Sequence, residues 1–172
     1  MEQSESIDRD PQLVRTLVCA AQAGDKLAVG DLLDLVTPYV RRLCGPIALD
    51  EGADATQETL IMIFRNLGQL RAPEALFGWV RTVAVREAVR IAKRRGAHAE
   101  LTELPAPGDP QLAVDVADVL RRLSPEHRAI LLLREVEGID EQHAAELLSV
   151  AVGTAKSRLS RARNSFRKEW RS

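Results

Sequence analysis

One stretch near the middle of the chain restricts the possible folds more than any other feature. Residues 96–110 carry three prolines and two glycines within fifteen positions. Because proline lacks a backbone N–H and clashes with the preceding turn, no continuous helix can cross this stretch. The parts on either side of it have apolar residues at helical spacing and no convincing strand pattern. The sequence therefore predicts an all-α chain with two small helical domains joined by a flexible linker.

The spacing of apolar residues and the positions of helix-breaking residues predict the individual helices. Their ranges are 11–23, 27–44, 53–67 and 72–95 before the break, and 114–123, 125–135, 141–148 and 152–169 after it. We expect a turn at residues 45–46, where glycine precedes proline, and a buried side of the third helix formed by Ile61, Phe64 and Leu67. Ser124 followed by proline is typical of a helix start.

The composition excludes several classes of protein. Hydrophobic residues make up 45% and charged residues 28% of the 172-residue chain, a mixture typical of a globular protein. The uncharged apolar runs are too short to cross a membrane, and the acidic N-terminus is unlike a secretory signal, so we expect a cytoplasmic protein without membrane insertion. Cys19 and Cys44 fit neither a disulfide framework nor a zinc site and are expected in the core as reduced thiols. No nucleophile motif, phosphate-binding loop or paired acid and base indicates an enzyme, and we expect no metal or cofactor.

The charge is distributed unevenly along the chain. The formal net charge is -1, yet residues 149–172 hold 7 basic and 1 acidic residue, whereas residues 96–148 hold 4 basic and 11 acidic residues. A cationic segment of this kind is a common feature of nucleic-acid-binding proteins. We also hypothesise that the two segments attract each other in the free protein and give a compact, partly self-occluded state.

Residues 138–166 have the pattern of a helix-turn-helix, with a short helix, a turn of about three residues and a longer second helix. The residues of the second helix expected to face the core, at spacings of three and four, are Val152, Ala155, Leu159, Ala162 and Phe166. The opposite face carries small and basic residues. Small residues allow close approach to the major groove, and Lys, Arg, Ser and Thr can contact base edges and phosphates.

Residues 123–138 and 152–163 together resemble region 4 of bacterial sigma factors, most closely that of the extracytoplasmic-function (ECF) group. In that group a run similar to residues 152–159 opens the recognition helix. The resemblance implies that this part of the chain reads the -35 promoter element as duplex DNA. The residues that would lie against this DNA are Arg134, Gly153, Thr154, Lys156, Ser157, Ser160 and Arg161.

The first part of the chain carries a second resemblance. Residues 54–67 are similar to the region 2.2 helix, which in the family binds the clamp-helix coiled coil of the polymerase β′ subunit, and this implies polymerase contacts by Asp54, Gln57 and Glu58. Residues 77–95 are similar to regions 2.3–2.4, so the loop before them would take up a flipped base and the helix would guide the opened -10 strand. The residues implied for -10 DNA are Gly68, Gln69, Leu70, Arg71, Arg81, Arg86 and Arg90.

The resemblance covers about residues 12–170 and implies an alternative sigma factor. Residues 10–95 would form region 2, residues 96–112 the linker and residues 113–172 region 4. The implied partners are core RNA polymerase, through the β′ clamp helices and the β flap, promoter DNA, and an anti-sigma factor that controls the protein.

Two positions depart from the family pattern. Arg81 stands where many members have Tyr, and Arg86 stands where they have Asn. Stacking of a base on an aromatic side chain is worth about 1–3 kcal/mol, so its loss bears on -10 preference or melting. Two alternatives stay open: a helix-turn-helix regulator that acts without core polymerase, and a sigma-like chain that sequesters a partner. The helices at 54–67 and 77–95 argue for the sigma factor, because an operator-binding regulator does not need them.

Overall fold

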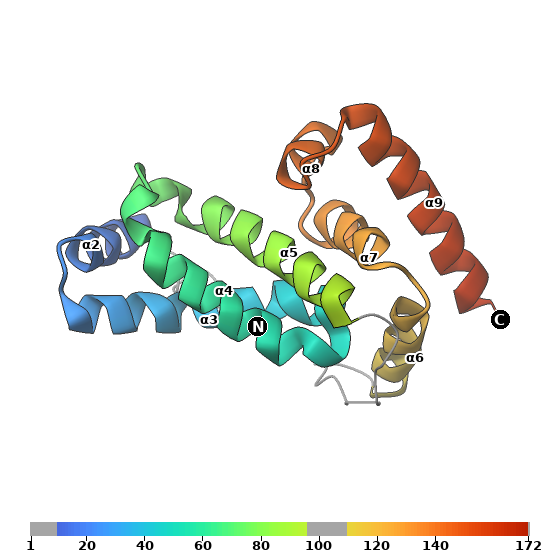
Figure 1. The fold of residues 1–172 in the computed structure, drawn as a ribbon, viewed down its shortest axis with the longest axis horizontal. Coiled ribbons are helices and arrows are strands. Elements are labelled where there is room, and N and C mark those ends of the chain that lie inside the picture. Colours follow the sequence, from blue (N-terminus) through green and yellow to red (C-terminus); the bar gives the residue numbers. More distant parts are fainter. Residues whose placement is uncertain (1–9, 96–109, 172) are drawn as a thin grey trace.

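The computed structural model describes residues 10–95, here called the N-terminal half, and residues 110–171, the C-terminal half. The N-terminal half contains α2 (Pro11–Gln22), α3 (Lys26–Ala48), α4 (Gly52–Asn66) and α5 (Leu76–Arg95), with the short turns η1 (Leu49–Glu51), η2 (Leu67–Gln69) and η3 (Pro73–Ala75). The C-terminal half contains α6 (Pro110–Arg121), α7 (Pro125–Leu131), the π-helical turn η4 (Leu132–Val136), α8 (Glu141–Leu147) and α9 (Val152–Trp170). The described residues form helices and no strand, so the all-α prediction is confirmed (Figure 1). Residues 96–109 of the predicted linker lie outside the described residues.

Acceptor side chains begin four of these helices. Asp10 accepts a hydrogen bond from the backbone N–H of Gln12, and Asp25 accepts one from that of Leu27. The Ser124 hydroxyl accepts from the N–H of His127 at the start of α7, as the sequence predicts. The Asp140 carboxylate accepts from the N–H of His143 at the start of α8. Each cap satisfies an N–H that has no partner within its own helix.

The second helix is longer than the sequence predicts. The turn expected at residues 45–46 is wrong, because α3 continues to Ala48 with Pro38 and Pro46 inside it. Each proline removes one helical hydrogen bond, which is unfavourable by roughly 3 kcal/mol. Burial of apolar side chains along the whole length of α3 offsets this loss, since the helix lies at the centre of the N-terminal half and contacts α2, α4 and α5. The helix ends where Leu49 takes a positive φ of 54°.

Two predictions about the core are also wrong. Phe64 is 58% exposed, whereas the buried side of α4 is formed by Ala55, Thr59 and Ile63. The small residues at positions 55 and 59 allow α4 to approach α3 and α5 closely, so the packed face is rotated away from Phe64. Cys44 is buried as predicted, but Cys19 lies on the exposed side of α2.

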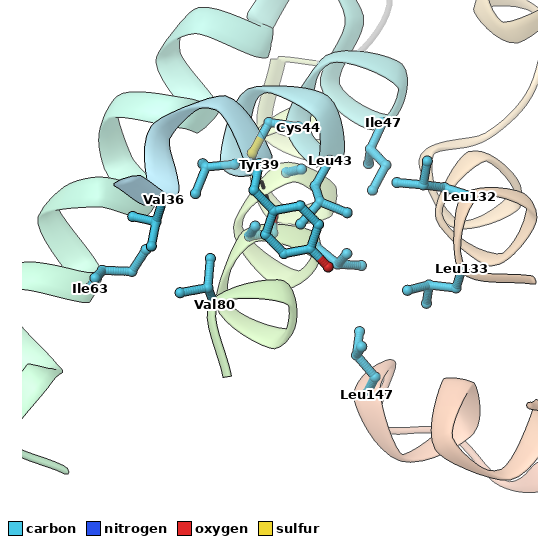
Figure 2. Packing of buried hydrophobic residues seen from close by; sticks show 14 of the residues in the cluster. Val36, Tyr39, Leu43, Cys44, Ile47, Ile63, Val80, Leu132, Leu133 and Leu147 are labelled. Atoms are coloured by element: carbon cyan, nitrogen blue, oxygen red, sulfur yellow. Dashed lines mark hydrogen bonds between the residues drawn. The ribbon is translucent and has the colours of Figure 1, made fainter. Parts of the chain in front are cut away.

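The apolar core continues from one half into the other. α7 packs against α3 and α5, and α9 packs across α6, α7 and α8 (Figure 1). Tyr39 and Ile47 of α3 belong to the same cluster as Leu132, Leu133 and Leu147 of the C-terminal half (Figure 2). The two halves therefore share one continuous core. No helix among the described residues is long and apolar enough to cross a membrane.

Candidate promoter-binding and polymerase-binding surfaces

α8 and α9 form a helix-turn-helix. The turn between them is closed by hydrogen bonds from Ser149 N–H to the Glu146 carbonyl and from Val150 N–H to the Ala145 carbonyl. Ala155, Leu159 and Ala162 are buried, as the sequence predicts for the inner face of α9. Phe166 is half-buried and stacks on Trp170, with ring centroids 6.0 Å apart. Val152 is 40% exposed, so its predicted place in the core is wrong: it lies in the first turn of α9, at the edge of the packed face.

The outer face of α9 brings together six of the seven residues predicted for -35 DNA. Gly153, Thr154, Lys156, Ser157, Ser160 and Arg161 are all exposed. The Arg161 guanidinium donates to the Ser157 hydroxyl at 3.2 Å, and the Lys156 ammonium lies 3.6 Å from a Glu141 carboxylate oxygen. No side-chain acceptor caps α9 at Ala151. The N–H groups of its first turn therefore add partial positive charge beside these cations, a combination that suits a phosphate.

Arg134, the seventh of these residues, has a different setting. It belongs to η4, is half-buried and donates from Nη1 to the carbonyl of Ile139. Its Nε is buried without a hydrogen-bond partner among the residues that the structure describes. The side chain thus holds the turn that precedes α8.

The loop predicted to receive a flipped base is only partly exposed. Gly68, Gln69 and Arg71 are exposed, but Leu70 is 7% exposed and packs in the core. The Gln22 amide donates to the Leu70 carbonyl at 2.7 Å and to the Leu67 carbonyl at 3.0 Å, which fixes the loop to α2. The Leu70 side chain therefore offers little surface to a base in this arrangement, and its contact with DNA stays a prediction.

The three arginines predicted on α5 already have protein partners. Arg90 forms three hydrogen bonds to the Glu87 carboxylate, the shortest at 2.6 Å. Arg81 lies 3.8 Å from the Glu137 carboxylate of the C-terminal half. Arg86 donates from Nε to the carbonyl of Leu147 at 2.8 Å. Two of the three thus contact the C-terminal half.

The residues predicted to bind polymerase lie together on α4. Asp54, Gln57 and Glu58 are exposed and, with Ile91 and Arg94 of α5, line a shallow cavity of about 350 Å³. Exposed carboxylates and an amide beside a basic residue suit a polar protein partner. No group of three or more His, Cys, Asp or Glu side chains in the described parts of the chain is placed to hold a metal ion.

The sequence did not identify three residues that join the halves. The Tyr39 hydroxyl donates to the Glu137 carboxylate at 2.7 Å, and burial and this carboxylate raise the pKa of Tyr39 to about 12. Arg128 is buried at the junction and donates to the Ile47 carbonyl of α3 at 2.7 Å, and burial lowers its pKa to about 10. The position of Arg128 directly before the apolar run 129–133 is a signal from which its burial could have been predicted. Nothing in the local sequence marks Tyr39 or Glu137 in this way.

The described residues form two helical halves, and the C-terminal half presents a helix-turn-helix with an exposed basic face. Residues 113–165 match the family described as Sigma-70, region 4. The chain is 28% identical to the RNA polymerase sigma-H factor of Pseudomonas aeruginosa, over 94% of this chain and 93% of that protein. It is 29% identical to the ECF RNA polymerase sigma factor SigM of Mycobacterium tuberculosis, over 86% and 79% of the two chains.

Solved structures agree with these relatives. The sigma factor RpoE of Bartonella quintana, in complex with the anti-sigma factor NepR, superposes with a TM-score of 0.68 at 26% identity, over 83% of this chain and 96% of that one. CnrH, in complex with the cytosolic domain of CnrY, has the same fold, with a TM-score of 0.63 at 19% identity over 91% and 96% of the two chains. Together, the family match and these similarities support the identification of the chain as an ECF sigma factor.

Proposed function

We propose that this chain binds core RNA polymerase as an alternative sigma factor and directs it to promoters. Residues 10–95 act as region 2 and residues 113–172 as region 4, with residues 96–112 between them. One observation carries most of the proposal: the chain has an exposed basic helix-turn-helix together with a separate exposed group, Asp54, Gln57 and Glu58, on α4. A regulator that only binds an operator needs the first and not the second.

Each DNA element has its own surface in this proposal. The outer face of α9 reads the -35 duplex, with Lys156 and Arg161 as its cations and small side chains allowing close approach. Arg134 supports that face from behind by holding the turn before α8. The exposed loop residues Gly68 and Arg71, followed by the arginines of α5, receive the opened -10 strand.

Two kinds of protein partner complete the proposal. Core polymerase binds region 2 through its β′ clamp helices and region 4 through its β flap. An anti-sigma factor holds the chain inactive, and the likeness to a sigma factor solved in complex with its anti-sigma factor supports this part. Co-expression with a candidate anti-sigma protein tests it: we expect a stable complex that no longer binds core polymerase, and a complex that still binds polymerase contradicts it.

Co-elution with bacterial core RNA polymerase in size-exclusion chromatography tests the main proposal. We expect the parent chain to co-elute and the Gln57→Ala plus Glu58→Ala variant to lose co-elution. A matched control, Gln12→Ala plus Asp34→Ala, also removes one exposed amide and one exposed carboxylate, but from α2 and α3, and should co-elute like the parent. Failure of the parent to bind polymerase, with DNA binding retained, would favour the operator-binding regulator.

A further inference from the structure

Residues 67–72, here called the α4–α5 loop, are fixed to α2 by the side chain of Gln22. Gln22 is the last residue of α2, and its amide nitrogen donates to the Leu70 carbonyl at 2.7 Å and to the Leu67 carbonyl at 3.0 Å. Both acceptors are carbonyl oxygens, so only the NH₂ group of the amide can make these bonds. α2 also contacts the neighbouring turn η3. One side chain of α2 thus holds two backbone groups of a distant loop.

The end of α2 gives Gln22 a rigid support. Gly24, two residues further on, has a φ of 94°, a conformation that glycine adopts without the usual steric cost. Its N–H donates to the Ala21 carbonyl at 3.1 Å, and Asp25 begins α3 by accepting from the Leu27 N–H at 2.9 Å. Because α2 ends and α3 begins within a few bonded residues, the backbone position of Gln22 is well defined.

A second anchor joins the α4–α5 loop to α4. The Gln69 side-chain amide donates to the side-chain oxygen of Asn66 at 3.1 Å, and the Asn66 amide donates to the Met62 carbonyl at 2.8 Å. The loop backbone is therefore bonded to α2, and the Gln69 side chain is linked to α4. Gly68 and Arg71 are exposed beside these two anchors.

The α4–α5 loop has little means of holding a base by stacking. It contains no aromatic residue, and its two leucines, Leu67 and Leu70, are 6% and 7% exposed. Proteins hold a flipped base by stacking and by hydrogen bonds to its edge. Since stacking within the loop is weak, hydrogen bonds from its backbone and polar side chains have to do more of the recognition. Such bonds are directional, so they depend on where the loop backbone lies.

From these observations we infer that Gln22 is a positioning residue for -10 recognition: by holding the carbonyls of Leu67 and Leu70, it fixes the α4–α5 loop in the arrangement that accepts an unpaired base. A loop that is ordered beforehand loses less conformational freedom when the base binds. It also discriminates better, because its polar groups stay unpaired when the base edge does not match. The DNA part of this inference rests on the proposed function, whereas the anchoring of the loop does not.

Two substitutions remove the anchor in different ways. Gln22→Met keeps the length of the side chain but cannot donate, and Gln22→Glu keeps its shape but places a carboxylate against two carbonyl oxygens. Gln12→Met and Gln12→Glu are matched controls, because Gln12 is another exposed glutamine of α2, near the opposite end of the helix. All four variants should give the circular dichroism of the parent and co-elute with core polymerase. Loss of co-elution in both Gln22 variants would contradict a role confined to the loop.

Hydrogen–deuterium exchange followed by nuclear magnetic resonance measures the anchoring. The Leu70 amide donates to the Leu67 carbonyl at 3.2 Å and reports on opening of the loop. Loss of two neutral hydrogen bonds predicts exchange about tenfold faster at this amide in both Gln22 variants. The Val29 amide, which donates to the Asp25 carbonyl in the first turn of α3, should keep its rate. Unchanged exchange of Leu70 in both variants would overturn the inference.

Selection of a randomised single-stranded oligonucleotide by the reconstituted holoenzyme measures base recognition. We expect the parent and the Gln12 variants to enrich one common sequence. Both Gln22 variants should lose preference several-fold at one position of that sequence and keep it at the others.

Two results of the selection would overturn the role of Gln22 in recognition. The first is an unchanged preference at every position although Leu70 exchanges faster. The second is an equal loss at all positions, which indicates a general effect on structure or charge. A parent that enriches no sequence would contradict the proposed function instead, and the exchange measurement would still decide whether Gln22 holds the loop.

Discussion

Replacement of Arg128 by methionine tests the energetics of the junction between the halves. Arg128 is 7% exposed and donates to the Ile47 carbonyl at 2.7 Å and to the Leu123 carbonyl at 2.6 Å. Hydrogen bonds from a charged donor contribute about 1.5–3 kcal/mol each, so the pair contributes about 3–6 kcal/mol. Burial lowers the pKa of Arg128 to about 10, which corresponds to a cost of about 3 kcal/mol for the buried cation. Arg128→Met keeps the side-chain stem and is predicted to lower the free energy of unfolding by about 2 kcal/mol.

Urea unfolding with tryptophan fluorescence measures this loss in each half separately. The chain has two tryptophans, Trp79 in the N-terminal half and Trp170 in the C-terminal half, so a Trp→Phe change at one position leaves a reporter for the other half. The exposed Arg167 serves as a control, because Arg167→Met should change the free energy of unfolding by less than about 0.5 kcal/mol. Since Arg128 bonds to carbonyls in both halves, both reporters should shift. An unchanged Trp79 midpoint would refute the contribution of the Ile47 bond.

Three further predictions concern the core, the DNA face and pH. Ile63→Ala leaves a cavity at a fully buried site between α4 and its neighbours. In urea titrations this variant should lower the free energy of unfolding by about 3 kcal/mol. A loss below about 1 kcal/mol would mean that the site is not tightly packed. Arg161→Ala should weaken binding of the reconstituted holoenzyme to -35 duplex DNA in fluorescence titrations. It should also reduce by about 1 the slope of the logarithm of the binding constant against the logarithm of the salt concentration. An unchanged slope would place Arg161 away from DNA. Burial, followed by Arg161 and Arg158, lowers the pKa of His127. Protonation therefore favours the unfolded chain, and the free energy of unfolding should fall as the pH drops below about 6.5. His127→Gln should flatten this decline, and an equal decline in both proteins would contradict the assignment.

Local patterns predicted most of the helices and the exposed outer face of α9. Ser124 and the spacing of Ala155, Leu159 and Ala162 placed α7 and α9, because a cap and a 3.6-residue period are properties of a single segment. Local patterns failed for α3, because Pro46 on its own predicts the end of a helix. The helices packed around α3 bury Ile47, the residue after Pro46, and this burial keeps the helix intact to Ala48.

Contacts between distant segments could not be predicted from such patterns. Leu70 and Gln69 are adjacent in a polar loop, yet only Leu70 is buried, because Gln22 of α2 fixes the backbone there. Likewise, nothing near Arg86 indicates that its partner is the end of α8, sixty-one residues away. The charge pattern suggested that residues 149–172 and residues 96–148 attract each other in a compact free state. Lys156 and Arg163 of the cationic segment do form ion pairs, but their partners lie in the same half. The contacts that join the two halves are made by Arg86 and Glu137 instead.

Mapping of transcription start sites on the genomic DNA of the source organism tests the central claim most directly. Core polymerase is reconstituted with the parent chain or with Gln57→Ala plus Glu58→Ala, and the 5′ ends of the transcripts are sequenced. We predict a discrete set of start sites that share one -10 and one -35 sequence with the parent, and loss of this set with the variant. Start sites identical to those of core polymerase alone would contradict a role in promoter recognition.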